Sequence, residues 1–140
     1  MFNKTEWFNK ILSEIKENGL KDESLMSLFT IFHINKVINS LNLIDEGNVI
    51  VLPNSHLFSY ELNDKNTKIY CRLKPKCYCT CVEFYQLAIY SSDVKVCHHL
   101  LSINLLEAIM ESGKENNIQF NDKSKDKLTF NDCHFLYLNI

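Results

Sequence analysis

The sequence predicts a small α+β fold in which an antiparallel β-meander packs against helices. Three observations predict this fold. Apolar residues recur at helical spacing in the first third, short β-branched and aromatic runs separated by turn residues follow, and a second helical apolar run ends near residue 110. The 140 residues suit a single domain over 1–140, divided into a helical N-terminal part (22–47), a central part (48–112) and a C-terminal extension (113–140).

Helical signals dominate the N-terminal part. A first helix is expected over 5–18, with Thr5 as its N-cap and Gly19 as its stop. A second helix is expected to start at Asp22, and the apolar residues that follow are too dense for a simple surface helix. This stretch is either one central core helix or two helices broken near 33–35.

The central part carries strand signals. Short runs rich in β-branched and aromatic residues occupy 49–52, 56–62 and 67–73. Residues 63–66 have the composition of a hairpin loop, and a meander over 48–81 is the simplest interpretation. Helices are expected at Val82–Tyr90 and over 100–110.

Composition and charge exclude several protein classes. The hydrophobic content of 46% and the charged content of 23% are ordinary for a globular protein. No apolar run reaches the roughly 18 residues of a membrane span, and the first ten residues lack a secretory signal, so no membrane association is expected. In a cytosolic or nuclear setting, the six cysteines are read first as metal ligands. The net charge of −2 does not favour a phosphate-backbone partner.

Four residues form a complete ligand set for one tetrahedral zinc ion. Cys79 and Cys81 make a Cys-x-Cys pair, and Cys97 and His99 make a Cys-x-His pair after a gap of fifteen residues. Three thiolates and an imidazole fill every position, so the predicted zinc is structural and the protein is not an enzyme. Residues i and i+2 share a face in a strand, which places Cys79-x-Cys81 at a strand end and Cys97-x-His99 at a helix start.

The remaining cysteines and histidines are weaker candidates for metal ligands. Cys77 shares a strand face with Cys79 and can replace Cys81 as a ligand, whereas His98 is assigned to solvent. The others are interpreted as buried small hydrophobes or as surface or satisfied histidines: Cys71, Cys133, His33, His56 and His134. A nucleophilic Cys97–His99 pair leaves the other clustered thiols unexplained, and a thiolate-rich site beside Glu83 is a poor Lewis acid for hydrolysis.

With its Cys-x-Cys and Cys-x-His pairs, the segment 79–101 resembles the SWIM zinc finger. That family has a small residue three positions after the histidine, usually alanine, where this chain has Ser102. Over 22–112 the chain is similar to the short SWIM-domain subunits of Shu recombination-mediator complexes. The resemblance implies a nuclear, non-enzymatic adaptor for homologous recombination and DNA repair. It would form a heterodimer with a RecA-like recombinase paralogue and promote recombinase filaments on single-stranded DNA. A homodimer is possible in isolation, and Cys79, Cys81, Cys97 and His99 would bind Zn²⁺.

Direct binding of nucleic acid by the finger is the alternative function. Basic residues with interleaved tyrosines favour it: Lys68, Arg72, Lys74 and Lys76, with Tyr70 and Tyr78. The net charge and the lack of a long basic stripe count against it. The salt dependence of DNA binding by the isolated chain discriminates between the two functions.

Overall fold

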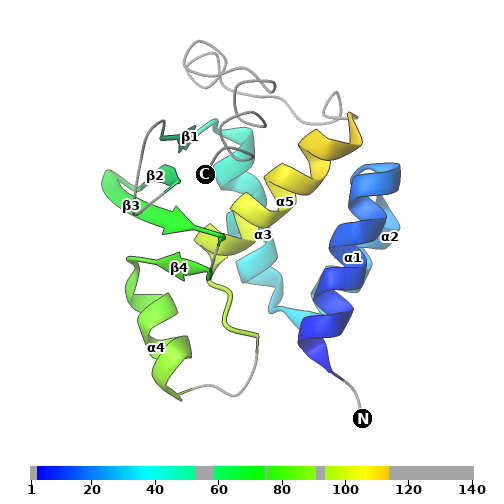
Figure 1. The fold of residues 1–140 in the computed structure, drawn as a ribbon, viewed down its shortest axis with the longest axis horizontal. Coiled ribbons are helices and arrows are strands. Elements are labelled where there is room, and N and C mark those ends of the chain that lie inside the picture. The colour runs from blue at the N-terminus through cyan, green and yellow to red at the C-terminus, as the bar shows by residue number, and fades with distance from the viewer. Residues whose placement is uncertain (1–2, 53–58, 75, 91–93, 114–140) are drawn as a thin grey trace.

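A computed structural model describes residues 3–52, 59–74, 76–90 and 94–113. Its elements are, in chain order, α1 (Lys4–Asn18), α2 (Asp22–Ile31), α3 (Ile34–Asp45), β1 (Val49–Val51), β2 (Tyr60–Asp64), β3 (Thr67–Arg72), β4 (Tyr78–Cys79), α4 (Val82–Tyr90) and α5 (His98–Ser112). The strands form one antiparallel sheet in the order β1-β2-β3-β4. Figure 1 shows α5 between this sheet and the pair α1 and α2. The predicted α+β class with an antiparallel meander is confirmed.

Local capping sets the bounds of the first helix. The side chain of Asn3, and not that of Thr5 as predicted, caps α1 by accepting from the backbone N–H groups of Thr5 and Glu6. An asparagine two residues earlier can reach two free N–H groups, which a cap at Thr5 would leave exposed. Gly19 ends the helix with φ of 82°, a conformation that glycine adopts without strain, as predicted.

The dense apolar stretch after Asp22 forms two helices. Phe32 is extended and interrupts the helical path, and His33 caps α3 by accepting from the N–H of Asn35 through Nδ1 at 3.1 Å. The break near 33–35 is therefore confirmed, and His33 is a satisfied histidine. Not all of these apolar residues enter the core, because Met26, Ile34 and other large side chains of these helices remain exposed.

A tight turn fixes the register of the central hairpin. Lys65 and Asn66 both have positive φ, of 52° and 67°, which makes a two-residue turn whose twist matches the strands. Asp64 pairs with Thr67, so β2 continues two residues further than the predicted 63–66 loop allowed. The consequence is that Asp64 has a fixed position at the end of a strand.

The central helix of the core is α5. Nine of its residues are buried, and they are His99, Leu100, Leu101, Ser102, Ile103, Leu105, Leu106, Ala108 and Ile109. The seven apolar ones belong to one hydrophobic cluster that also includes residues of α1, α3 and the sheet, whereas His99 and Ser102 are buried polar residues. No helix among the described residues has the length and apolar character needed to cross a bilayer. Most of the predicted C-terminal extension, 114–140, lies outside the described residues.

A carboxyl group lies between α5 and the sheet. The hydroxyl of Tyr60 donates to Oε1 of Glu107, and burial raises the pKa of Glu107 to about 7 against the opposing effect of that hydrogen bond. The folded protein therefore binds more protons than the unfolded chain between the ordinary pKa of 4.5 and about 7. The contribution of Glu107 to folding consequently becomes less favourable as the pH rises through this window.

Glu107→Gln is expected to remove this pH dependence. Urea unfolding at pH 8 should show the variant to be more stable than the parent, by at most roughly 3 kcal/mol, because the ionised carboxylate is no longer buried. At pH 4 the two proteins should differ little. Glu14→Gln, at an exposed position of α1, is the control and should leave the pH profile unchanged. A parent-like loss of stability between pH 5 and 8 in Glu107→Gln would contradict this assignment.

Candidate metal centre

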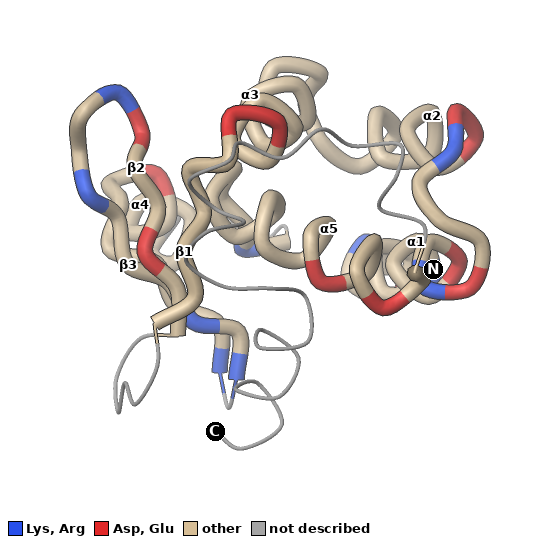
Figure 2. Tube along the Cα trace, turned by 90° about the horizontal axis from the view of Figure 1, so that it is seen from above, with Lys and Arg blue, Asp and Glu red and all other residues tan. Residues whose placement is uncertain are grey.

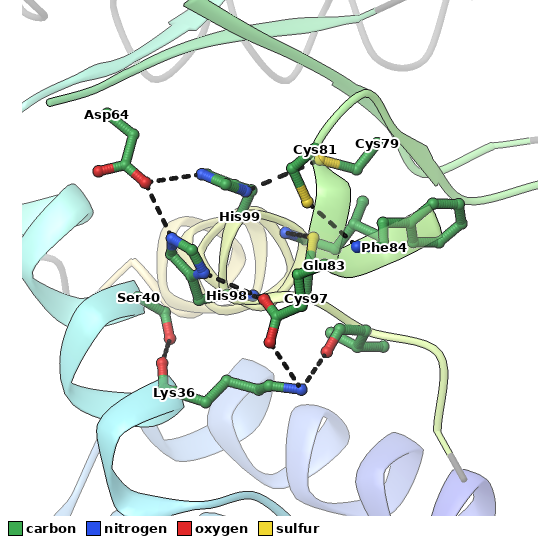
Figure 3. Close-up of polar contacts among 12 residues, drawn as sticks. Lys36, Ser40, Asp64, Cys79, Cys81, Glu83, Phe84, Cys97, His98 and His99 are labelled. Atoms are coloured by element: carbon green, nitrogen blue, oxygen red, sulfur yellow. Dashed lines mark hydrogen bonds and ion pairs between the residues drawn. The ribbon is translucent and has the colours of Figure 1, made fainter. Parts of the chain in front are cut away.

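Four predicted ligands converge where β4, α4 and α5 meet. Cys79 ends β4, Cys81 lies immediately before α4, and Cys97 is the N-cap of α5 with His99 in its first turn. This is the strand-end and helix-start geometry that the spacing predicts. The four side chains form one group among the described residues that could hold a metal ion, and Figure 3 shows them facing a common point.

The donor atoms have the separations that a tetrahedral ion needs. All four lie within 4.8 Å of one another, and Cys79 Sγ is 3.8 Å from His99 Nδ1. Zinc bonds of about 2.3 Å to sulfur and about 2.0 Å to nitrogen put such donors roughly 3.6 Å apart at the tetrahedral angle. Cys97, Cys79, His99 and Cys81 are only 0%, 2%, 3% and 9% exposed. The residues therefore fit a buried ion closed off by four protein ligands.

Two helix N-termini support the sulfur atoms. The N–H of Phe84 donates to Cys81 Sγ at 3.3 Å, and the N–H of Leu100 approaches Cys97 Sγ at 3.5 Å. Free N–H groups and the positive end of the helix dipole both favour a thiolate at these positions. The starts of α4 and α5 thus stabilise negative charge at the same centre.

The thiols cannot all ionise without a cation. Hydrogen bonds from Cys79 and Cys97 lower the pKa of Cys81. The pKa of Cys79 is raised, first by its hydrogen bond with Cys71, and the pKa of Cys97 is raised, first by its hydrogen bond with Cys79. Neighbouring sulfur atoms repel a second thiolate, whereas a divalent cation bound among them reverses that repulsion. The cluster is therefore electrostatically suited to a cation.

Asp64 orients the imidazole of His99. Its Oδ2 lies 2.8 Å from His99 Nε2, while Nδ1 of the same ring faces Cys79. A histidine that binds a metal through one nitrogen commonly donates its other N–H to a carboxylate, which fixes the tautomer. Burial acts to raise the pKa of Asp64, but the hydrogen bonds from His98 and His99 outweigh it and the pKa is lowered. Sequence reasoning missed this role because it placed Asp64 in a loop.

The assignment of His98 to solvent is wrong. Its ring lies between two carboxylates, with Nε2 2.9 Å from Asp64 Oδ2 and Nδ1 3.2 Å from Glu83 Oε1. The hydrogen bond to Glu83 is the largest influence that raises the pKa of His98. Lys36 of α3 extends the network, because its Nζ lies 3.5 Å from Glu83 Oε2 and donates to the carbonyl of Val96 at 2.9 Å. Figure 3 shows this chain of contacts running from α3 to the centre.

The other cysteines differ in their relation to the centre. Cys77 is half-buried and does not belong to the four-residue group, so Cys81 occupies the position for which both were candidates. Cys71 is fully buried as predicted, but its Sγ is 3.2 Å from Cys79 Sγ, which sequence spacing did not indicate. Ser102 is buried and its hydroxyl is satisfied by the carbonyl of His99 at 2.6 Å. His56, Cys133 and His134 lie outside the described residues.

The candidate nucleic-acid residues Lys68, Tyr70 and Arg72 share one face of β3, opposite the buried Ile69 and Cys71. Lys68 lies near the turn end of β3 and Arg72 lies at the opposite end of the same strand, and Figure 2 shows basic residues at both ends of the sheet. The guanidinium of Arg72 is 5.7 Å from the ring of Tyr78. This contact places one predicted stacking residue against a basic residue of the chain itself.

No protein-family model, curated protein or solved structure matches this chain. The interpretation of the centre therefore depends on its geometry and on the chemistry of its donor atoms.

Asp64→Asn is expected to weaken zinc binding by about 10–100-fold, because the amide does not orient and polarise His99 as a carboxylate does. Competition with a chromogenic chelator measures this change. Glu61→Gln is the matched control, since Glu61 lies on the same strand but outside the contacts with His98 and His99. An Asp64→Asn protein with parental zinc affinity would show that the carboxylate does not support the ligand.

Proposed function

We propose that this protein is a non-enzymatic zinc-binding adaptor in homologous recombination and DNA repair. It pairs with a RecA-like recombinase paralogue and thereby promotes assembly or stability of recombinase filaments on single-stranded DNA. The observation that carries the proposal is the closed, buried donor set of Cys79, Cys81, Cys97 and His99. Three thiolates and an imidazole in tetrahedral positions suit Zn²⁺ and leave no site for water or substrate. The recombination context comes from the resemblance to SWIM fingers.

The ion would determine the position of α4. Among the side chains of this helix whose burial the structure describes, only Phe84 is well buried. The helix is joined to the rest of the structure through the ligand Cys81 and through Glu83. Figure 1 shows α4 beyond β4, at the edge of the structure opposite α1 and α2. Zinc bound by Cys81 and by residues of β4 and α5 would hold α4 at a fixed angle.

The outer face of α4 is the surface that we assign to the recombinase paralogue. Val82, Tyr85 and Ile89 are 72%, 64% and 53% exposed and recur at the spacing of one helical face. Exposed apolar residues at such a spacing are typical of a protein interface. This face begins directly after a zinc ligand, so loss of the ion would also misplace the docking surface. Zinc would thus act on function through the geometry of α4.

Co-purification tests the proposal. The tagged chain should be recovered with one zinc ion and with a protein that mass spectrometry identifies as a RecA-like ATPase. Combined Tyr85→Ala and Ile89→Ala substitutions should retain zinc and lose the ATPase. The matched control combines Met26→Ala and Ile38→Ala, which truncate exposed apolar side chains on α2 and α3 that are not joined to the centre. Steeply salt-dependent binding of single-stranded DNA by the isolated chain, with no ATPase recovered, would instead support direct nucleic-acid binding.

A further inference from the structure

Cys71 is a buried thiol beside the centre that the proposed function does not use. It lies on β3, is 0% exposed, and its Sγ is 3.2 Å from Sγ of Cys79. We propose that Cys71 and Cys79 form a hydroperoxide-responsive disulfide site. Closure of this disulfide withdraws one ligand from the metal centre.

Strand register places the two cysteines correctly for a disulfide. Cys71 and Cys79 are directly opposite in the antiparallel pair of β3 and β4. The adjacent pair is hydrogen-bonded, because Thr80 N donates to Tyr70 O and Tyr70 N donates to Thr80 Oγ1, both at 3.1 Å. Cys71 and Cys79 therefore occupy a non-hydrogen-bonded position, where Cα atoms are about 4.5 Å apart and side chains are closest. This separation is within the range of natural disulfides, so the bond requires little backbone movement.

Other thiol pairs are less suitable partners. Cys81 and Cys97 are assigned to the ion together with Cys79, so their sulfur atoms are held by the metal when it is bound. Cys77 is half-buried and is not opposite Cys79 in the sheet. Cys71 combines a sulfur atom that is free of the ion with a backbone position fixed by the sheet. It is therefore the thiol that can attack an oxidised Cys79 without displacing Cys81, Cys97 or His99.

The oxidation is balanced with one molecule of hydrogen peroxide. One cysteine sulfur attacks a peroxide oxygen, the O–O bond breaks, and a sulfenic acid and water form. The second sulfur attacks the sulfenic sulfur, the S–S bond forms, the S–O bond breaks and a second water leaves. The two sulfur atoms are oxidised, and the two thiol protons end in the two water molecules. Where Cys79 begins as a thiolate, as it would when it holds a metal ion, solvent supplies the missing proton.

A short edge strand gives the oxidant access. β4 has two residues and lies at the edge of the sheet, and Thr80 next to it is exposed. Two-residue edge strands open locally at low cost, which exposes their side chains to small molecules. Once the disulfide has formed, only Cys81, Cys97 and His99 of the four-residue group remain as donors for a metal ion. The release of zinc and the loosening of α4 rest on the proposed function, whereas the pairing of the two sulfur atoms does not.

Disulfide mapping tests the pairing on the whole chain. Zinc-loaded and metal-free protein are treated with hydrogen peroxide, remaining thiols are alkylated, and peptides are sequenced by mass spectrometry. A Cys71–Cys79 crosslink with loss of two hydrogens should dominate in both samples, and a zinc indicator should report release from the loaded one. A map dominated by Cys79–Cys81 or Cys79–Cys97, with Cys71 alkylated, would overturn the proposal. If the chain binds no zinc, the metal-free sample still tests the pairing, and only the metal assignment fails.

The Cys71→Ala variant distinguishes zinc release caused by the disulfide from zinc release caused by direct oxidation of the ligands. The variant should bind zinc with parental stoichiometry and release it at least several-fold more slowly in peroxide, because the second sulfur is missing. Cys77→Ser should release zinc at the parental rate. Equal release from Cys71→Ala and the parent would contradict the ligand-withdrawal mechanism. If Cys71→Ala does not fold, the peptide map of the unaltered protein still decides the pairing.

Discussion

Replacement of Cys97 by serine is expected to abolish zinc retention and to leave little stable protein. Structural zinc contributes about 10–16 kcal/mol in small fingers, which is comparable with the entire stability of a domain, about 5–15 kcal/mol. Serine is an effective N-cap, so this substitution preserves the cap of α5 and removes the metal bond selectively. Metal analysis and urea unfolding measure the two effects. We expect Cys81→Ser and His99→Ala to behave in the same way.

Cys77→Ser is the matched control for these ligand variants. Cys77 is a half-buried thiol near the centre that does not belong to the ligand group. This variant should keep one zinc ion per chain and lose less than about 1 kcal/mol of stability, as expected away from the core and the site. A Cys97→Ser protein that is soluble, zinc-loaded and as stable as Cys77→Ser would refute the ligand role of Cys97.

Removal of the ion from the unaltered protein is expected to destabilise β4 and α4 before the rest of the structure. A high-affinity chelator should cause β4 and α4 to lose amide protection first, since the ligands join these elements to α5. The core residues of α1, α3 and α5, such as Ile11, Val37 and Leu105, are 2%, 0% and 0% exposed and bury apolar surface independently of the ligands. These helices should therefore retain protection longer, as expected when parts of one structure unfold separately. Hydrogen exchange followed by mass spectrometry resolves the two regions.

Addition of zinc to the chelated sample is the control for this experiment. Protection of β4 and α4 should return with one equivalent of zinc, and Cys97→Ser, where soluble, should show no response. Loss of protection that begins in α1, or that is the same with and without chelator, would contradict the role of the ion at the β4 and α4 end.

The sequence predicted local features that depend on short spacing. The Cys79-x-Cys81 and Cys97-x-His99 pairs imposed a strand end and a helix start, and both appear in the structure. Val82–Tyr90 was predicted with its observed bounds because turn residues and cysteines enclose one short helical run. Gly19 ended the first helix because glycine tolerates positive φ.

Features set by tertiary pairing were not accessible in the same way. Asp64 and His98 are 34 positions apart, and their contact depends on the register of β2 and β3 and on the packing of α5. Cys71 lies against Cys79 because β3 and β4 pair in one particular register. A hairpin loop two residues too long placed Asp64 outside the sheet, and that error concealed its contact with His99.

Zinc K-edge X-ray absorption on the purified chain tests the central claim most directly. The account predicts one zinc per chain, with three sulfur neighbours near 2.3 Å and one nitrogen neighbour near 2.0 Å. A chain that binds no zinc, or a spectrum dominated by oxygen neighbours with an open coordination position, would contradict a closed structural centre.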